Sequence, residues 1–145
     1  MIRLSSFIVL LGLVAFAQAA AASPPIPVTM TLTADFSGSP IQGTFTASSP
    51  LCPSGTFVTE VVGGGGGLHA FALTGRQHMT CDDGSGTFVI QFHPQSNPES
   101  PMPSGPWAAL GGTGAYAGMH GAGSFVALSP PPTVVAEFTG AVHFD

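Results

Sequence analysis

Few charged side chains in this sequence could orient a small molecule, and Arg76 is the most informative of them. The chain has two Lys or Arg residues, and the other, Arg3, lies in a segment that we expect to be removed. An arginine with a glutamate partner, Glu60 or Glu137, would orient a ligand inside an apolar pocket. On an outward face the same residues would simply be solvated charges. Because both faces of the predicted strand from Leu68 to Met79 carry apolar residues, the alternation leaves the two interpretations open.

The sequence lacks the signatures of nucleophilic catalysis and of phosphate binding. It contains no Gly-x-Ser-x-Gly turn, and a Ser-x-x-Lys motif is impossible because the chain has no lysine. The glycines from Gly111 to Gly118 do not have the spacing of a dinucleotide-binding fingerprint. We therefore leave any catalytic residue unassigned and predict no cofactor; whether the protein is an enzyme stays open, with a protein that is not an enzyme favoured.

Histidines and acidic residues do not group into a metal motif. No two histidines are two or four residues apart, which would aim two imidazoles at one ion from a strand or a helix; the five are His69, His78, His93, His120 and His143. The run from Asp82 to Gly86 resembles part of a calcium loop but lacks the later oxygen ligands. We predict a β-turn there and no metal site.

The N-terminus has the three parts of a secretory signal peptide. A short basic start is followed by an apolar run from Phe7 to Phe16 and by the small-residue signal Ala17-Gln18-Ala19. The apolar run is about half of the ~20 residues that a membrane-spanning helix needs. We expect residues 1–19 to be removed, the exported chain to begin near Ala20, and the protein to be secreted or periplasmic, with no membrane span.

Export also determines how the two cysteines are interpreted. Cys52 and Cys81 are the only pair, and in an oxidising compartment we predict a disulfide between them. A reactive or metal-binding thiol pair is the alternative, although neither cysteine lies in a Cys-x-x-Cys motif.

The predicted exported chain is acidic and rich in β-forming residues. Without Arg3, one arginine stands against seven carboxylates, which argues against binding to nucleic acid or to anionic membrane surfaces. Residues 20–145 suit one domain, and the many Phe, Val and Thr residues favour an all-β fold.

Apolar and polar residues alternate in most of the predicted strands. Val28 to Phe36 alternates strictly, and the other predicted strands are 41–48, 54–62, 68–81, 85–93, 107–110, 124–129 and 133–144. We expect Gly63 to Gly67 to be a flexible loop and Pro94 to Pro106 to be a surface loop outside any central strand. About eight strands without a helix predict a single antiparallel barrel, with a β-sandwich as the alternative.

The Gly-Gly-Thr-Gly-x-Tyr-x-Gly-x-x-Gly run from Gly111 to Gly121, between two strands, resembles the allene oxide cyclase and dirigent-protein superfamily. Together with the runs 44–47, 51–55 and 81–86 it is also similar to a group of small exported bacterial proteins of unsettled function. The resemblance implies an eight-stranded barrel with a central cavity. It also implies a pocket that works without a cofactor, since some members cyclise an unsaturated epoxide and others steer the coupling of phenol radicals.

We therefore expect an exported barrel that binds a small apolar or aromatic molecule, with an interior that Phe45, Phe57, Phe88 and Phe138 do not fill. The predicted ligand-binding residues are Arg76, Glu60, Glu137, Phe88 and Tyr116. A cofactor-free cyclase or isomerase and a structural or surface-interaction domain are the alternatives.

Overall fold

The computed structural model describes residues 23–67 and 70–145. Their strands are β1 (Ile26–Asp35), β2 (Ile41–Ala47), β3 (Ser54–Gly67), β4 (Ala70–Cys81), β5 (Gly86–Phe92), β6 (Gln95–Ser96), β7 (Ser104–Gly114), β8 (Met119–Ala127) and β9 (Thr133–Phe144). The predicted signal peptide and the start near Ala20 lie outside the described residues, as do Leu68 and His69. Within the described ranges, no helix is long and apolar enough to cross a bilayer.

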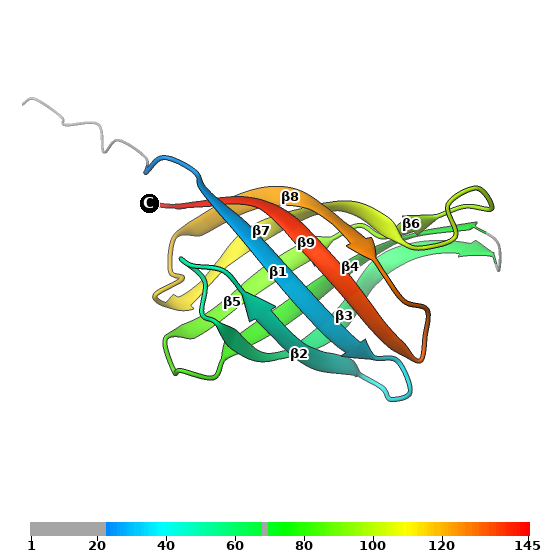
Figure 1. The fold of residues 1–145 in the computed structure, drawn as a ribbon, viewed down its shortest axis with the longest axis horizontal. Helices are drawn as coiled ribbons and strands as arrows, with labels where there is room; N and C mark the ends of the chain where they lie inside the picture. The colour runs from blue at the N-terminus through cyan, green and yellow to red at the C-terminus, as the bar shows by residue number, and fades with distance from the viewer. Residues whose placement is uncertain (1–22, 68–69) are drawn as a thin grey trace, which may run out of the picture.

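Eight of these strands close into an antiparallel barrel, as the sequence predicts (Figure 1). The order around the barrel is β3-β2-β1-β9-β8-β7-β5-β4, and β3 pairs with β4 to complete the ring. The short strand β6 is the additional one and pairs with β4 and β7 at one end. Closure pairs the edge strands with each other, so the fold is a barrel and not the alternative sandwich.

The alternation in β1 matches the inside and outside of the barrel. Val28, Met30, Leu32 and Ala34 are buried, while the threonines between them are exposed. Phe36, which the sequence pattern places on the same face, lies after the end of the strand and is 44% exposed.

Glycines opposite phenylalanines let two strands pack closely inside the barrel. Gly43 is opposite Phe57, and Phe45 is opposite Gly55, in the pairing of β2 with β3. A Cβ built on Gly43 would lie 2.8 Å from Cζ of Phe57, and one on Gly55 would lie 2.6 Å from Cε1 of Phe45. Each phenyl ring therefore occupies the space that a side chain on the opposite strand would need.

The run from Gly63 to Gly67 is not the flexible loop that its composition predicts. It forms the end of β3 and pairs with residues 70–74 of β4, after a bulge between Val61 and Gly63. Gly64 and Gly66 have φ values of 121° and 153°, and a Cβ on Gly64 would lie 2.4 Å from the carbonyl oxygen of Ala72. Glycine is thus needed for this backbone path, and backbone pairing holds a segment that has no side chains to pack.

The glycine-rich run near the C-terminus is a turn between two strands, as predicted. Gly114 and Gly118 have positive φ values of 60° and 87°, and the backbone N–H of Met119 donates to the carbonyl of Tyr116 at 3.1 Å. Both strands reach further into the run than the sequence predicts, to Gly114 in β7 and back to Met119 in β8.

The proline-rich segment is also more ordered than predicted, since β6 lies within it and β7 includes Pro106. Pro106 pairs with Ser124 of β8, and its carbonyl oxygen accepts a hydrogen bond from the backbone N–H of His93 at 3.0 Å. The prediction that the segment stays outside a central strand is therefore wrong at its C-terminal end. Proline has no backbone N–H to donate, but its carbonyl oxygen still accepts a hydrogen bond between strands of the barrel.

The predicted disulfide is present. Cys52, in the loop between β2 and β3, is bonded to Cys81 at the end of β4 with an S–S distance of 2.05 Å. Such a bond is typical of proteins from oxidising compartments, in keeping with the predicted export.

The barrel interior has two different halves. The end at which β4 finishes is filled, and we call it the packed half; its buried side chains include Phe45, Leu51, Phe57, Met79, Phe88, Tyr116 and Met119. The ring of Phe88 lies 5.8 Å from that of Phe45 and 5.0 Å from that of Tyr116. The opposite end, where β4 begins and β6 lies, is the open half (Figure 1).

Candidate functional site

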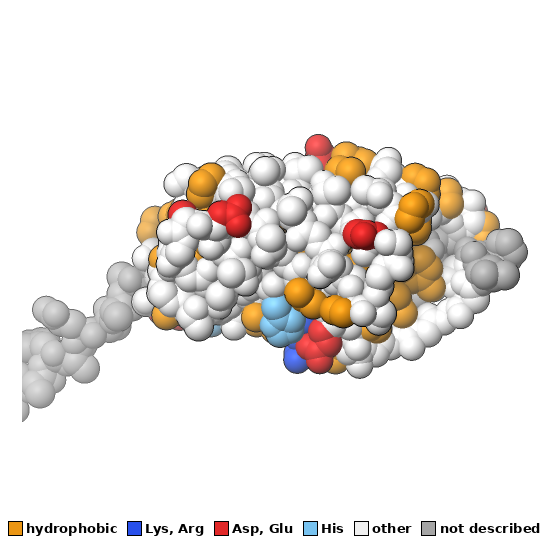
Figure 2. All heavy atoms as spheres, turned by 90° about the horizontal axis from the view of Figure 1, so that it is seen from below, with side chains coloured by type: hydrophobic (Ala, Val, Ile, Leu, Met, Phe, Trp, Pro, Cys, Tyr) orange, Lys and Arg blue, Asp and Glu red, His pale blue; other side chains and the backbone are white. Residues whose placement is uncertain are grey.

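The open half encloses a cavity of about 350 Å³. Strands β1, β2, β3, β4, β5, β8 and β9 all contribute to its wall, together with the loops before β7 and β9. The lining is almost entirely apolar, and apolar side chains gather at this end of the molecule in Figure 2. A site of this size and polarity is typical of pockets for small molecules.

Small residues in the inward positions create this space. Ala34, Ala127 and Ala136 line the cavity, whereas the buried side chains of the packed half include large ones such as Phe88 and Met79. The strands alternate in the same way at both ends of the barrel. Large inward side chains fill one end, and small inward side chains leave a cavity at the other.

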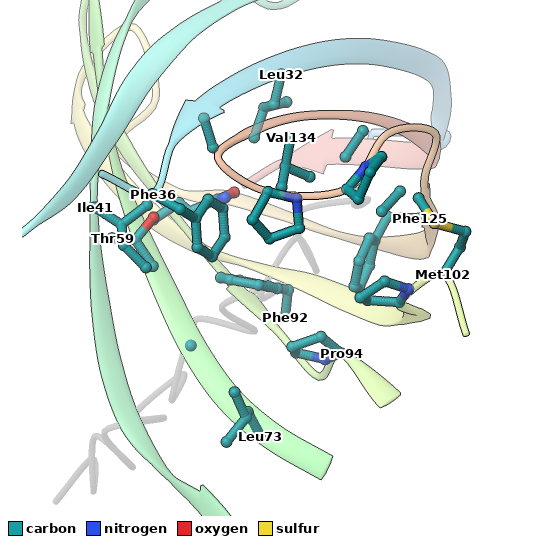
Figure 3. A pocket seen from close by; sticks show the side chains of 18 of the residues that line it. Leu32, Phe36, Ile41, Thr59, Leu73, Phe92, Pro94, Met102, Phe125 and Val134 are labelled. Atoms are coloured by element: carbon teal, nitrogen blue, oxygen red, sulfur yellow. The ribbon is translucent and has the colours of Figure 1, made fainter. Parts of the chain in front are cut away.

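Aromatic side chains make one rigid wall of the cavity. Phe125 and Phe138 are opposite each other on β8 and β9, and their rings stack with centroids 4.9 Å apart. Phe92 of β5 meets Phe125 edge to face at 5.7 Å. Figure 3 shows Phe92 and Phe125 on the cavity, with Leu32 and Val134 across from them. A wall of mutually packed rings keeps its shape without a ligand.

The loops at the mouth are held by backbone hydrogen bonds. The N–H of Phe36 donates to the carbonyl of Pro132 at 2.8 Å, and the N–H of Ala127 donates to that of Pro103 at 2.8 Å. The N–H of Leu73 donates to the carbonyl of Pro94 at 3.1 Å. Proline restricts the remaining freedom of these loops, so the mouth is largely preformed.

The few polar groups of the lining differ in what they already bind. The Ser129 hydroxyl donates to the carbonyl of Thr133 at 2.9 Å and accepts from the N–H of Val135 at 2.8 Å. The Thr74 hydroxyl lies 3.1 Å from Nδ1 of His93. Gln77 is different, because it is only 6% exposed and its Oε1 is buried without a hydrogen-bond partner. Thr59 is directly opposite Gln77 in the pairing of β3 with β4.

Arg76 does not lie on the cavity. Its strand neighbour Gln77 lines the interior, so alternation places Arg76 on the outer face of β4. There its Nε donates to Oε1 of Gln91 at 3.2 Å. Glu60, opposite Arg76 on β3, has its carboxylate 3.3 Å from Nε2 of His78. Basic, acidic and histidine side chains lie together on the outer surface in Figure 2.

The other predicted ligand-binding residues are also away from the cavity. Glu137 is exposed on β9, between the inward residues Ala136 and Phe138. Phe88 and Tyr116 are inside the barrel but in the packed half, and the Tyr116 hydroxyl lies 3.2 Å from that of Ser85. None of the five predicted residues therefore lines this cavity, because the strand alternation turns three of them outward and the packed half encloses two.

The sequence signal for Gln77 was available in the strand pattern. Leu73, Gly75, Gln77, Met79 and Cys81 share one face of β4, and all but Gln77 are apolar or glycine. A single amide within such a face is expensive to bury without a partner, and so marks a functional position.

Two aspartates, Asp35 at the end of β1 and Asp83 in the turn after β4, have a lowered pKa. Two hydrogen bonds from Ser37 lower the pKa of Asp35; the one from the serine side chain has the larger effect and the one from its backbone the smaller. The corresponding bonds from Ser85 lower the pKa of Asp83 in the turn after Cys81. This turn is the predicted one.

Among the described residues, the one grouping of potential metal ligands is Cys52, Cys81 and Asp83. Its two sulfurs are joined in the disulfide, so they are not available as thiolate ligands. His120 and His143 lie near the C-terminus and contact each other and Asp145. Nε2 of His120 lies 3.0 Å from the Asp145 carboxylate, and the His120 and His143 rings stack with centroids 5.5 Å apart.

Comparisons with known proteins add no relative. No family model, no curated protein and no solved structure matches this chain.

Proposed function

We propose that this protein binds one small apolar or aromatic molecule in the open half of its barrel. The observation that carries the proposal is the preformed cavity of about 350 Å³ with an apolar lining. One water molecule takes about 30 Å³ in the liquid, so this volume equals that of about a dozen waters and suits a small organic molecule. Transfer of such a molecule from water to this lining is favourable because apolar surface is removed from water.

Binding is a better-supported proposal than catalysis. The described lining carries no titratable side chain, since its polar members are Thr59, Thr74, Gln77 and Ser129. General acid or base chemistry uses a titratable side chain within reach of the substrate. The cyclase or isomerase implied by the superfamily resemblance stays a prediction, and the structural domain is less favoured because the interior contains a cavity of about 350 Å³.

A cavity-filling variant tests the proposal. Ala136→Phe places a ring inside the cavity, and Val135→Phe places the same ring on the outer face of β9 as a matched control. We expect 2-methylnaphthalene, which is of suitable size, to bind the natural chain with a stoichiometry of one in isothermal titration calorimetry. Ala136→Phe should weaken binding by more than about tenfold, whereas Val135→Phe should not change it.

Two results would overturn the proposal. One is the absence of saturable binding of 2-methylnaphthalene and of its polar analogues described below to the folded natural chain. The other is equal binding to Ala136→Phe, with its fold verified by circular dichroism, because binding would then occur outside the cavity.

A further inference from the structure

We infer that the ligand of this cavity is a neutral apolar alcohol or phenol, whose hydroxyl group is held by Gln77 and Thr59. This inference rests on the proposed function and specifies the ligand class. It starts from Gln77, whose side chain lines the cavity, is 94% removed from solvent and carries an Oε1 without a partner. An unpaired buried acceptor is costly to the folded protein, and a ligand that supplies a donor removes that cost.

The position of Gln77 makes it the floor of the cavity. The next inward residue toward the packed half is Met79, which is 1% exposed, and the preceding inward residues, Gly75 and Leu73, line the cavity. A ligand that enters through the mouth thus places its leading group next to the Gln77 amide. The terminal torsion of glutamine is soft, so the amide can turn its oxygen toward the ligand.

The neighbours of Gln77 indicate a group that both donates and accepts. Across the sheet, Gln77 is opposite Thr59 on one side and Ile90 on the other. Opposite residues on one face of an antiparallel pair have Cβ atoms about 5 Å apart, so one ligand group can reach both polar side chains. A hydroxyl group fits, because it donates to Oε1 of Gln77 and accepts from the Thr59 hydroxyl.

The same lining discriminates against anions. Within the described part of the chain, the lining includes no Lys, Arg or His, and Arg76 is on the outer face of β4. A carboxylate at the cavity floor would lose its hydration without a cation in return, because the polar side chains there, Gln77 and Thr59, are neutral. Fatty and aromatic acids should therefore bind more weakly than the corresponding alcohols.

Three naphthalenes of similar size test the inference by calorimetry at pH 7: 2-naphthol, 2-methylnaphthalene and the 2-naphthoate anion. We expect 2-naphthoate to bind at least about tenfold more weakly than 2-naphthol. Gln77→Met keeps the approximate length of the side chain and removes its amide, the oxygen and the NH2 group together. The ratio of the 2-naphthol Kd to the 2-methylnaphthalene Kd should rise by about tenfold in this variant, the equivalent of one satisfied hydrogen bond.

A second variant and a melting measurement keep the test decisive. Thr59→Val should raise the ratio of the 2-naphthol Kd to the 2-methylnaphthalene Kd by a smaller factor. This variant provides the test if Gln77→Met fails to fold. Without ligand, Gln77→Met should melt at or above the temperature of the natural chain, because an unpaired buried group is removed. A purely structural role of Gln77 would lower it instead.

The outcomes separate this inference from the proposed function. If all three compounds fail to bind the natural chain, the proposed function is wrong. If 2-methylnaphthalene binds but the Kd ratio is the same in the natural chain, Gln77→Met and Thr59→Val, the ligand class is wrong and the cavity remains a binding site. Tighter binding of 2-methoxynaphthalene than of 2-naphthol would also overturn the inference, since that compound accepts a hydrogen bond but cannot donate one.

Discussion

Phe88 and Phe92 lie four residues apart on β5, point to the same side of the strand and end in opposite environments. Phe88 is 0% exposed, between Phe45 and Tyr116 in the packed half, whereas Phe92 is partly exposed on the cavity. Both belong to β5, although the pairing of β5 with β7 shifts register between Phe88 and Ile90. The surroundings differ, since Met79 is opposite Phe88, whereas Phe92 packs over Gly75 and has the cavity beside its ring.

This contrast separates the end of the barrel that is filled with side chains from the end that contains the proposed binding site. The packed half, closed by the disulfide, supplies dense contacts that hold the strands together. The open half has fewer such contacts, because an apolar cavity lies between its side chains. Substitutions at the two ends should therefore affect different measurements.

The largest expected effect comes from truncating the two phenylalanines. Phe88→Ala should lower the free energy of unfolding by about 3 to 5 kcal/mol, because it leaves a void among well-packed rings. Phe92→Ala should cost clearly less, since the cavity already leaves part of that ring without contacts. Urea unfolding of both variants measures the difference. Equal losses would show that the open half is as well packed as the other and would contradict the contrast.

Removing the disulfide should have the next largest effect. The bond links residues 29 positions apart, and a loop of that length is worth about 3 to 4 kcal/mol on the chain-entropy model. The double variant Cys52→Ala and Cys81→Ala should thus melt at a lower temperature. Binding of 2-methylnaphthalene, measured well below the melting temperature, should stay within about twofold of that of the natural chain. A large loss of affinity in a folded variant would show that the two ends are coupled.

Acid should produce the smallest effect, and it should be similar at the two ends. Asp35 is the last residue of β1 at the open half, and Asp83 lies in the turn after β4 at the packed half. Hydrogen bonds from a following serine lower the pKa of both. A lowered pKa in the folded state stabilises the protein above the pKa of the unfolded chain, and this contribution is lost as the pH falls through the folded-state pKa. Asp35→Asn and Asp83→Asn should each reduce stability slightly at pH 7 and flatten its decline in acid.

Urea unfolding at several pH values between neutrality and strong acid checks this prediction. The control is Glu99→Gln, a change at an exposed carboxyl whose side chain lies in neither turn. A stability profile of either aspartate variant that is as steep in acid as that of the natural chain would contradict it.

Much of this fold could be predicted because local patterns and tertiary structure agree. The alternation from Val28 to Ala34 gives the inward face of β1 directly, and two cysteines in a predicted exported chain give the disulfide. Gly63 to Gly67 could not be assigned as a strand, because glycine has low strand propensity and the pairing with β4 comes from the whole barrel. Pro106 was misassigned for a similar reason, since its carbonyl finds a partner that local rules do not show.

The site was harder to predict because a cavity is a property of many strands together. No single segment shows that Ala34, Gly75 and Ala136 meet around one space. The facing of β4 could have been assigned from the polar residues His78 and Thr80, which share a side with Arg76. Charge drew attention to Arg76, whereas the neutral amide of Gln77, one position later, is the group that burial leaves unpaired.

The C-terminus lies at the packed half, and its position has a consequence for attaching the protein to a surface. Asp145 follows β9 beside the glycine-rich turn, with its backbone N–H donating to the carbonyl of Gly118 at 3.2 Å. In Figure 1 this end of the chain and strand β6 are at opposite ends of the barrel. A tether joined to Asp145 would therefore hold the barrel with its mouth directed away from the support. Immobilised in this way, the protein would present every copy of its cavity to the solution in the same orientation.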